Sequence, residues 1–347
     1  MKRVGIRDVA ERAGVSISTV SNALNHPHTV SAPLVERVRR VADELGYLPL
    51  QAAQQLRAGR NGLLGMTVIN IANPFFAALV SGAEEAAAAA GYRILVGNSD
   101  DDVVKERGHL ELFERVQVEG VIVSPFGDAG PSIRRLQARG IPVVLADAKD
   151  DDAQLPSVSF DDVAGGRLAA EHLLANGRRR IAFVGAREEV RQVRERLQGA
   201  REAVAEHTDA RLEVVISTRT TAALGQAFGA DIAAAPRAEW PDAILATNDH
   251  LACGIVSGLV GAGVRVPEDI AVIGYDDIEF ASVAAVPLTS VRQPAREMGR
   301  RAAELLVEHI AGSREHRALV FQPELVVRAS TKTTSTAAAT TTGAAAG

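Results

Sequence analysis

The sequence predicts a small all-α head followed by an α/β body of two doubly wound, parallel-sheet lobes. With 347 residues, the chain is longer than a single hydrophobic core usually serves. Apolar residues recur with a helical period up to about residue 48, whereas from residue 61 short apolar runs alternate with segments of helix length. Residues 1–60 hold nine basic and five acidic side chains, although the whole chain has a net charge of −5. A basic head on an acidic body indicates that the head approaches a polyanion.

Composition and cysteine content limit the compartment and the class of protein. The charged residues after Lys2 and Arg3 interrupt any apolar core of a signal peptide, and no later run reaches transmembrane length. The single cysteine, Cys253, has no partner for an intrachain disulfide or a cysteine-based zinc site. We therefore expect a cytoplasmic protein without a membrane segment, metal or cofactor.

The head begins with two short helices joined by a glycine turn. The first is predicted over residues 6–13, where apolar side chains recur at the spacing i, i+3, i+4, i+7 at Ile6, Val9, Ala10 and Ala13. Gly14 ends this helix, and Ser16 is a natural N-cap for a second helix from Ile17 to about Leu24. Two helices that meet across such a turn form a helix-turn-helix, whose second helix lies in the DNA major groove.

The outward side chains of the second helix are the candidate DNA contacts. Ser18 and Asn22 can hydrogen-bond to base edges, and Ile17 can pack against a thymine methyl group. Phosphate oxygens, which position a protein without specifying a sequence, suit the hydroxyls of Ser16, Thr19 and Ser21. The alternative is an ordinary three-helix bundle with polar outer side chains.

A third helix is predicted between Ser31, its N-cap, and Gly46, which ends it. With this helix, the head resembles that of the LacI/GalR family of repressors. The resemblance is carried by the runs Asp8–Ser16, Ser18–Asn22, Leu24–Asn25 and Val30–Ser31. Many members carry Arg or His at the position of Asn22, so the operator sequence of no single member transfers to this chain.

A hinge over residues 49–60 is expected after the head, which covers residues 1–48. The segment Leu50–Arg57 favours a helix by propensity but is too short to be stable alone. The resemblance implies that two such segments pair in a dimer, enter the minor groove and wedge Leu56 between base steps. A plain linker is the alternative interpretation. Leu50 stands where some members have a polar side chain that contacts phosphate, so we expect one contact fewer here.

The body over residues 61–331 is predicted to form two lobes of similar build. Buried strands are predicted at Gly65–Asn70, Arg93–Gly97, Gly120–Ser124, Pro142–Ala146, Arg180–Gly185, Ala243–Thr247 and Ile270–Gly274. Their alternation with helices indicates parallel βαβ units. The resemblance implies a periplasmic-binding-protein-like body with crossovers near residues 161, 291 and 322. We expect a first lobe over about 61–160 and 292–321, a second over about 161–291 and 322–331, and a disordered tail over 332–347.

Residues that follow the strands are the candidate ligand contacts, because open parallel sheets bind ligands beyond the carboxyl ends of their strands. These residues are Phe75, Phe76, Asp147, Asp161, Arg196, Asn248, Asp249 and Asp276. Carboxylates, amides and an arginine beside aromatic rings suit a neutral, hydroxyl-rich ligand such as a sugar. The resemblance implies that these positions and Gln293 line an effector pocket. For Asp161 and Asp249, capping of the following helix is an equal alternative.

Two further observations bear on the ligand. Val190 and Gln192 stand where purine-binding members of the family have polar ligand contacts, and Thr220 stands where several members have an aromatic ring, so a purine is disfavoured. The acidic runs Asp100–Asp102 and Asp150–Asp152 are interpreted as solvated loops rather than metal sites.

Together these expectations describe a DNA-binding transcriptional repressor rather than an enzyme. The sequence has no dinucleotide-binding, Walker or nucleophile-elbow motif, and an exported sugar-binding protein would lack the head. A homodimer, or a dimer of dimers, would bind a palindromic operator, because two-fold symmetry in the protein mirrors that in the DNA. A small effector, a sugar or sugar derivative, would change the relative orientation of the lobes and alter operator affinity by about 1–3 kcal/mol.

Overall fold

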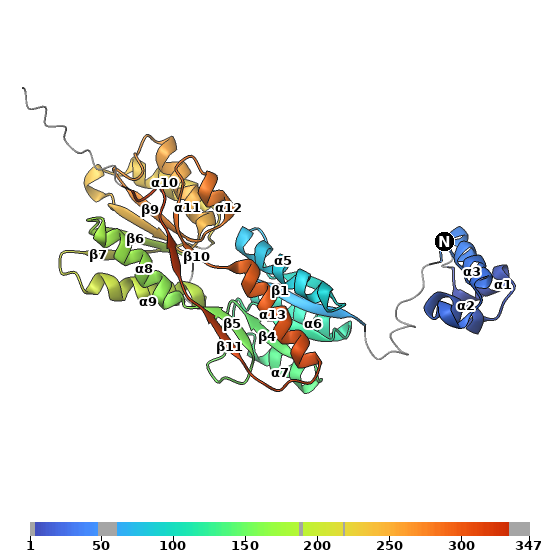
Figure 1. Ribbon diagram of the computed structural model, residues 1–347. Coiled ribbons are helices and arrows are strands. Elements are labelled where there is room, and N and C mark those ends of the chain that lie inside the picture. The colour runs from blue at the N-terminus through green and yellow to red at the C-terminus, as the bar shows by residue number, and fades with distance from the viewer. Residues whose placement is uncertain (1–3, 48–60, 187–189, 218, 333–347) are drawn as a thin grey trace, which may run out of the picture. The chain divides into compact units, whose positions relative to one another are not determined.

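The computed structural model describes residues 4–47, 61–186, 190–217 and 219–332, and the chain divides into two compact units, residues 1–62 and 63–347. The predicted hinge helix, including Leu50 and Leu56, lies outside the described residues, as does the tail from residue 333. The fold class predicted from the sequence is confirmed, since the first unit is helical and the second contains two parallel-sheet lobes (Figure 1).

The head consists of helices α1 (Ile6–Ala13), α2 (Ile17–Asn25) and α3 (Ala32–Leu45) around a small apolar core. Gly14 and Gly46 end α1 and α3 in the left-handed conformation, with φ of 65° and 64°, which glycine adopts without steric cost. A short 3-10 helix, η1 (Pro27–Thr29), separates α2 from α3 and was not predicted. Valines from each of the three helices make the centre of the core: Val9, Val20 and Val38.

Each lobe of the body is built on a six-stranded sheet. The first sheet is parallel throughout and has the order β11-β5-β4-β3-β1-β2, with bounds β1 Leu63–Val68, β2 Arg93–Asn98, β3 Gly120–Val123, β4 Val143–Ala146, β5 Ser157–Phe160 and β11 Ala318–Phe321. The second has the order β12-β10-β9-β8-β6-β7, with bounds β6 Arg180–Gly185, β7 Arg211–Ile216, β8 Ala243–Ala246, β9 Ala271–Asp276, β10 Thr289–Arg292 and β12 Glu324–Val326. Only β12 runs antiparallel to its neighbour among these described strands.

Helices cover both faces of each sheet (Figure 1). Those of the first lobe are α5 Pro74–Ala89, α6 Val103–Arg115, α7 Gly130–Ala138 and α13 Ala295–Ile310. Those of the second are α8 Asp162–Ala175, α9 Arg191–Ala205, α10 Ala222–Ala234, α11 Asp249–Gly261 and α12 Glu279–Val283, with the 3-10 turn η2 Arg237–Glu239. Helices α8 and α9 approach closely at Gly166, where an added Cβ would lie 2.0 Å from the carbonyl oxygen of Arg196. This glycine therefore lets α9 bring Arg196 against the start of α8.

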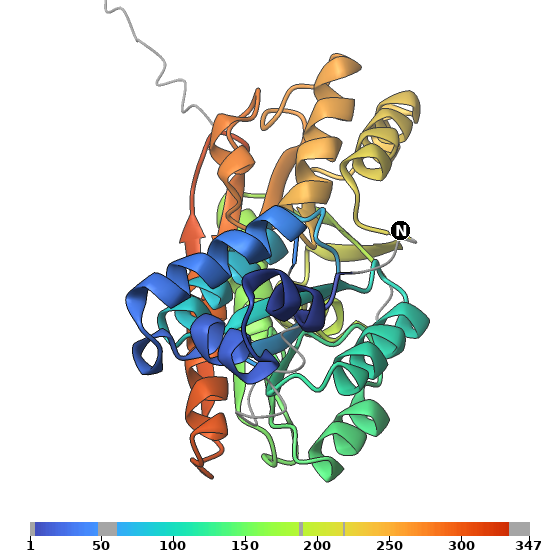
Figure 2. The same cartoon turned by 90° about the vertical axis from the view of Figure 1, so that its right-hand side faces the viewer.

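The described chain passes between the lobes three times, after β5, after β10 and after β11. Figure 2 shows the orange and red C-terminal segments running through both lobes. Strands β5 and β11 form one edge of the first sheet, and β10 and β12 form one edge of the second. All crossovers therefore gather at one side of the body, and β2 and β7 are the edge strands farthest from them.

None of the helices in the described part of the chain has the length and apolar character needed to cross a membrane.

Candidate functional site

The start of helix α2 is organised by hydroxyl groups. The predicted N-cap is confirmed, because the Ser16 Oγ accepts a hydrogen bond of 3.1 Å from the backbone N–H of Thr19. The same Oγ lies 2.8 Å from the hydroxyls of both Ser18 and Thr19. These three candidate DNA contacts thus form one hydrogen-bonded group at the positive end of the helix.

The outer face of α2 carries the candidate base contacts. Ile17, Ser18 and Asn22 are exposed, whereas Val20 and Ala23 of the same helix are buried in the head core. The phosphate candidates Thr19 and Ser21 are half-buried beside this face. With 44% of its surface accessible, Ile17 is the exposed large hydrophobic residue of the described head. An apolar side chain among hydroxyls and an amide is a surface suited to reading base edges and thymine methyl groups.

A cavity of about 490 Å³ lies between the two lobes of the body. The predicted ligand contacts that line it are Phe75, Phe76, Asp147, Arg196, Asn248, Asp276 and Gln293. Asn73, Gln192 and Thr247 join them from the ends of other strands and helices, and Val190 and Thr220 also line the cavity. The lining therefore combines three aromatic rings, those of Phe75, Phe76 and Phe126, with a dense set of amides and charges from both lobes.

Arg196 is the buried centre of the charged lining. Its Nε lies 2.7 Å from Asp162 Oδ1, its Nη1 donates to the carbonyl oxygen of Thr247, and its guanidinium stacks 3.7 Å above the ring of Tyr275. Burial alone would lower the pKa of Arg196. The neighbouring carboxylates, led by Asp162, outweigh this effect, so the pKa lies above its ordinary value. Arg196 is thus a permanent cation whose charge and orientation are fixed by the protein. Asp162 was not among the predicted residues.

Two carboxylates face the cavity from strand ends with unusual backbone geometry. Asp147 follows β4 with a φ of 55°, and Asp276 ends β9 with a φ of 108°. Asp276 accepts hydrogen bonds from Asn73 Nδ2 at 3.2 Å and from Gln293 Nε2 at 2.8 Å. Burial raises the pKa of Asp276 to about 6 against the opposing effect of Arg196. Burial also raises the pKa of Asp147 well above its usual range.

Several buried polar atoms of the lining lack a hydrogen-bond partner among the described residues. They are Asp147 Oδ1, Gln192 Oε1, Gln293 Oε1 and Thr247 Oγ1. The amide nitrogens of both glutamines are already used, since Gln192 donates to Asp147 at 2.9 Å and Gln293 donates to Asp276. The free atoms are hence mostly acceptors, and a ligand rich in hydrogen-bond donors would satisfy them.

Phe75 and Phe76 form an aromatic pair in the apolar part of the lining. Their rings meet edge to face, with centroids 5.0 Å apart. Asn73 caps helix α5 through a hydrogen bond of 3.1 Å from the N–H of Phe75, and Pro74 starts the helix, so both rings sit in the first turn. The helix start therefore places an aromatic surface beside the polar groups.

Asp161 and Asp249 do not line the cavity. The Asp161 carboxylate caps α8 and accepts a hydrogen bond from the N–H of Ala164 at 3.0 Å, as the capping alternative predicts. Asp249 is fully buried and accepts hydrogen bonds from Ser290 Oγ at 2.7 Å and the Ile278 N–H at 2.9 Å. Its predicted capping role is wrong by one residue, because the cap of α11 is the side chain of Asn248. Both aspartates thus hold the fold rather than face the cavity.

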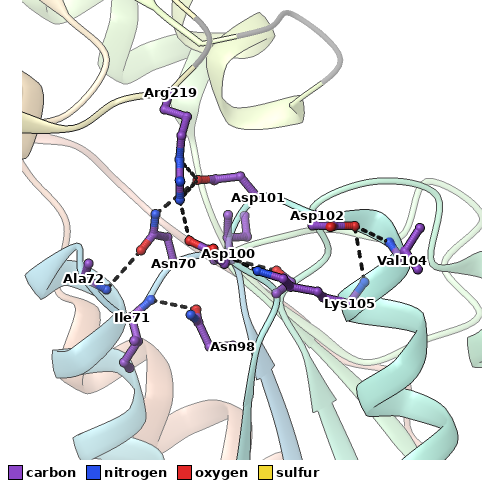
Figure 3. Close-up of polar contacts among 12 residues, drawn as sticks. Asn70, Ile71, Ala72, Asn98, Asp100, Asp101, Asp102, Val104, Lys105 and Arg219 are labelled. Atoms are coloured by element: carbon purple, nitrogen blue, oxygen red, sulfur yellow. Dashed lines mark hydrogen bonds and ion pairs between the residues drawn. The ribbon is translucent and has the colours of Figure 1, made fainter. Parts of the chain in front are cut away.

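Asp100–Asp102 form a solvent-accessible loop, as interpreted from the sequence, but the loop has a further role that was not predicted. These residues line the cavity together with Lys105 and Arg219, and Arg219 belongs to the second lobe (Figure 3). The sequence shows the acidic run but not its partner, which lies more than a hundred residues away. Among the described residues, no cluster of three or more histidine, cysteine or acidic side chains is arranged to hold a metal ion.

Comparison with known proteins gives matches to both units. Residues 5–49 match the description "Bacterial regulatory proteins, lacI family", and residues 170–331 match "Periplasmic binding protein-like domain". The HTH-type transcriptional repressor PurR of Photobacterium profundum is 34% identical over 336 residues, which cover 94% of this chain and 98% of that relative.

Solved structures resemble the chain over nearly its whole length. The complex of the transcriptional regulator CelR with cellobiose has a TM-score of 0.69 at 31% identity, and covers 94% of this chain and 100% of that one. The lac repressor dimer bound to operator and the anti-inducer ONPF has a TM-score of 0.77 at 28% identity, and covers 95% of this chain and 99% of that one.

Proposed function

The chain belongs to the lacI family of bacterial regulatory proteins, helix-turn-helix repressors with an effector-binding domain, and from this premise we propose that a neutral sugar or sugar derivative in the interlobe cavity controls its affinity for a palindromic operator. The observation that carries the choice of effector is the set of unpartnered buried acceptors, Asp147 Oδ1, Gln192 Oε1 and Gln293 Oε1. Sugar hydroxyls supply donors in such numbers, and each buried acceptor left unpaired costs about 1–3 kcal/mol.

The charges of the lining favour a neutral ligand over an anionic one. Arg196 is paired with Asp162 at 2.7 Å, and Lys105 is paired with Asp100 at 2.9 Å. Arg219 is likewise paired with Asp100. A sugar phosphate would have to displace one of these carboxylates, at a cost in desolvation and lost pairing. The relative solved with cellobiose supports a neutral sugar as the class of effector.

The aromatic pair gives the cavity a surface for the apolar face of a sugar ring. Phe75 and Phe76 are 3% and 6% exposed and present ring edges and faces beside Asn73. Apolar packing on one face of a sugar with hydrogen bonds around its rim is the usual arrangement of a pocket that selects by shape and polarity.

The head is proposed to read one half-site of the operator through α2. Ile17, Ser18 and Asn22 would face base edges in the major groove, while phosphate oxygens would be contacted by Ser16, Thr19 and Ser21. The proposal includes Leu56, which lies outside the described residues, as a wedge in the minor groove. Replacing Leu56 with Ala should weaken binding to the operator far more than binding to random DNA, and equal losses on both would refute the wedge.

A homodimer is proposed as the DNA-binding form, with a dimer of dimers as the alternative assembly. Exposed apolar side chains occur on both lobes, at Leu95 and Val96 of β2 and at Phe280 and Val283 of α12. Apolar residues exposed on a soluble chain are suited to burial against a second copy. The related lac repressor structure is a dimer on its operator.

Ligand binding is linked to DNA binding because the cavity is made by both lobes. A sugar that contacts Asp147 in the first lobe and Arg196 in the second binds tightly in one relative orientation of the lobes. The orientation of the lobes sets the spacing of the two hinges in a dimer. We expect a coupling of about 1–3 kcal/mol, a 5- to 150-fold change in operator affinity.

The test is a thermal-shift screen of the full chain, followed by operator gel shifts with any compound that binds. The screen contains neutral sugars such as ribose and cellobiose, the corresponding sugar phosphates, and purine bases and nucleosides. Neutral sugars should raise the melting temperature, because a ligand that binds the folded state stabilises it by mass action. A melting temperature raised only by purines or only by phosphorylated sugars would overturn the proposed effector class. A chain lacking residues 1–60 should keep the ligand response and lose operator binding.

A further inference from the structure

One polar contact between the lobes lies far from the crossovers. Arg219 follows β7, the outer edge strand of the second sheet, and Asp100 and Asp101 follow β2, the outer edge strand of the first. All three crossovers join the opposite edges of the sheets. A rotation of the lobes about the crossovers therefore moves these residues farther than any contact near β4 or β9.

The contact is an ion-pair cluster that lines the cavity (Figure 3). Arg219 Nη2 pairs with Asp100, and it lies 3.3 Å from Asp101 Oδ2. On the side of the first lobe, Lys105 Nζ holds Asp100 Oδ2 at 2.9 Å, and Asn70 Nδ2 donates to Asp101 Oδ2 at 3.1 Å. Lys105 and Arg219 lower the pKa of Asp100, so its carboxylate is charged at neutral pH. Arg219 is the residue of this cluster that crosses between the lobes.

The two aspartates are held in position by a strained backbone. Asp100 and Asp101 have φ values of 51° and 58°, so two consecutive residues other than glycine adopt the left-handed conformation. This conformation is sterically unfavourable for a residue that carries a Cβ atom. The buried Ser99 anchors one side through a hydrogen bond of 3.1 Å to the Val68 carbonyl, and Asp102 anchors the other by capping α6. The loop therefore presents its carboxylates to Arg219 with little freedom to turn away.

We propose that Arg219, Asp100 and Asp101 form an ionic gate across the open side of the cavity. The ion pairs hold the lobes together at this side, and a small molecule gains faster access to the cavity when they break. The gate follows from contacts within this chain. It rests on the proposed function only for the identity of the small molecule that enters the cavity.

The gate differs physically from the contacts nearer the crossovers. There, Gln192 bonds to Asp147 and Asn73 bonds to Asp276, and these side chains are buried. The gate is solvent-accessible, with side chains of Arg219 and Asp100 that are 43% and 36% exposed. Exposed ion pairs are weak and are screened by salt, whereas buried amide bonds are not. Salt therefore separates the gate from these buried contacts. It also screens the exposed interlobe pairs of Arg191 with Asp151 and of Lys149 with Glu195, so only the part of a salt response that depends on Arg219 reports on the gate.

Distances between spin labels on the ligand-free full chain test the gate. Labels are attached at Arg107→Cys on α6 and Ala223→Cys on α10, in a Cys253→Ala background, and labelled chains are diluted with unlabelled ones so that one labelled copy is measured per dimer. At low salt the wild-type chain should give a short, narrow distance distribution that lengthens and broadens at about 1 M NaCl, where the Debye length is about 3 Å. Arg219→Gln should be long and broad at both salt concentrations, and Arg219→Lys should retain part of the salt response.

A matched control and a second readout accompany this measurement. Arg237→Gln removes an exposed arginine that pairs with Asp269 inside the second lobe, and it should behave as the wild type. Access is read from the rate at which N-ethylmaleimide labels Val193→Cys, a position in the cavity lining. Arg219→Gln should raise this rate about two- to fivefold, the range expected for the loss of an exposed ion pair.

The outcomes distinguish the gate from the proposed effector. Identical distance distributions for the wild type and Arg219→Gln, with equal labelling rates, would overturn the gate even if a sugar were found to bind. A salt response of the wild type that Arg219→Gln abolishes would support the gate even if no sugar bound. If Arg219→Gln did not fold, the difference between the salt responses of the wild type and of Arg219→Lys would still test the gate, and identical responses would overturn it.

Discussion

The head and the interlobe cavity both present polar side chains to a ligand, but in opposite surroundings. At the start of α2 the hydroxyls of Ser16 and Ser18 are exposed and bond to each other, and that of Ser16 also bonds to the Thr19 hydroxyl. In the cavity wall, Arg196 pairs with Asp162 behind it, and the two side chains are 7% and 6% exposed and depend on each other for their charge balance. A polar group in water is solvated whether or not DNA is present, whereas a buried one is costly without its partner. Substitutions in the head should thus change DNA binding, and substitutions in the cavity should also change stability.

The largest expected effect is on the stability of the body. Arg196→Met leaves Asp162 buried without its cation, which should lower the free energy of unfolding by about 3–5 kcal/mol. Urea unfolding followed by circular dichroism measures the loss. Arg167→Gln, which removes a solvent-accessible arginine of the same helix pair, should cost far less, because exposed ion pairs are weak. Equal effects of the two variants would show that burial does not distinguish the cavity from the surface.

The second effect is the pH dependence of stability that buried carboxylates confer. The pKa of Asp276 in the folded chain is about 6, above its ordinary value of 3.8, so the folded state binds more protons between these pH values than the unfolded state does. The stability present at the acid end of this window is lost as pH rises through it, by at most about 1.4 kcal/mol per pH unit. Urea midpoints of the wild type should fall from pH 4 to pH 6. The fall should be smaller in Asp276→Asn, and an unchanged slope would contradict the assignment.

The same contrast explains what the sequence could predict. In the head, the helix stop Gly14, the cap Ser16 and the outer residues of α2 are neighbours in the chain, so local rules place them correctly. In the cavity, the rule for strand ends predicts Asp147 and Asp276, because each strand can be recognised by itself, whereas Arg196 lies within α9 and is also implied by the family resemblance.

What the sequence could not predict depends on pairing between distant segments. Asp162 follows directly after the predicted Asp161, but only the fold places its carboxylate against Arg196 and leaves Asp161 as the helix cap. Arg219 follows β7, an edge strand whose alternating exposure gives no continuous apolar run to recognise. Its pairing with Asp100 requires both sheets and the crossovers between them, and no periodicity within one segment carries that information.

A third prediction concerns a substitution that should change the sequence specificity of DNA binding without changing the stability of the head. Asn22→Ala removes an exposed amide from the outer face of α2, and it should weaken operator binding by about 1–3 kcal/mol if Asn22 bonds to a base. The melting temperature should stay within the change expected from about 0.5 kcal/mol. Gel shifts with operator and with random DNA separate the two kinds of binding. A loss of the same size on both DNAs would assign Asn22 to the phosphate backbone instead.

The smallest expected effect concerns Ser16, a residue of the head with both a structural role and a proposed role in DNA binding. Ser16 caps α2 and is also a candidate phosphate contact, so Ser16→Ala should lower the local stability of α2 by about 1 kcal/mol. Amide hydrogen exchange of α2 in the full chain measures this change. Ser31→Ala is the matched control, because the Ser31 side chain makes no capping hydrogen bond to α3 and its loss should leave exchange unchanged.

Ser16→Asp separates the two roles, because a carboxylate at this position keeps the cap and suits the positive end of the helix, yet repels phosphate. This variant should therefore exchange like the wild type and bind all DNA more weakly, with a shallower dependence of affinity on salt if a phosphate contact is lost. If Ser16→Asp instead binds DNA as well as the wild type does, Ser16 acts as a cap alone. The contacts to the backbone then fall to Thr19 and Ser21, which flank the exposed face of α2.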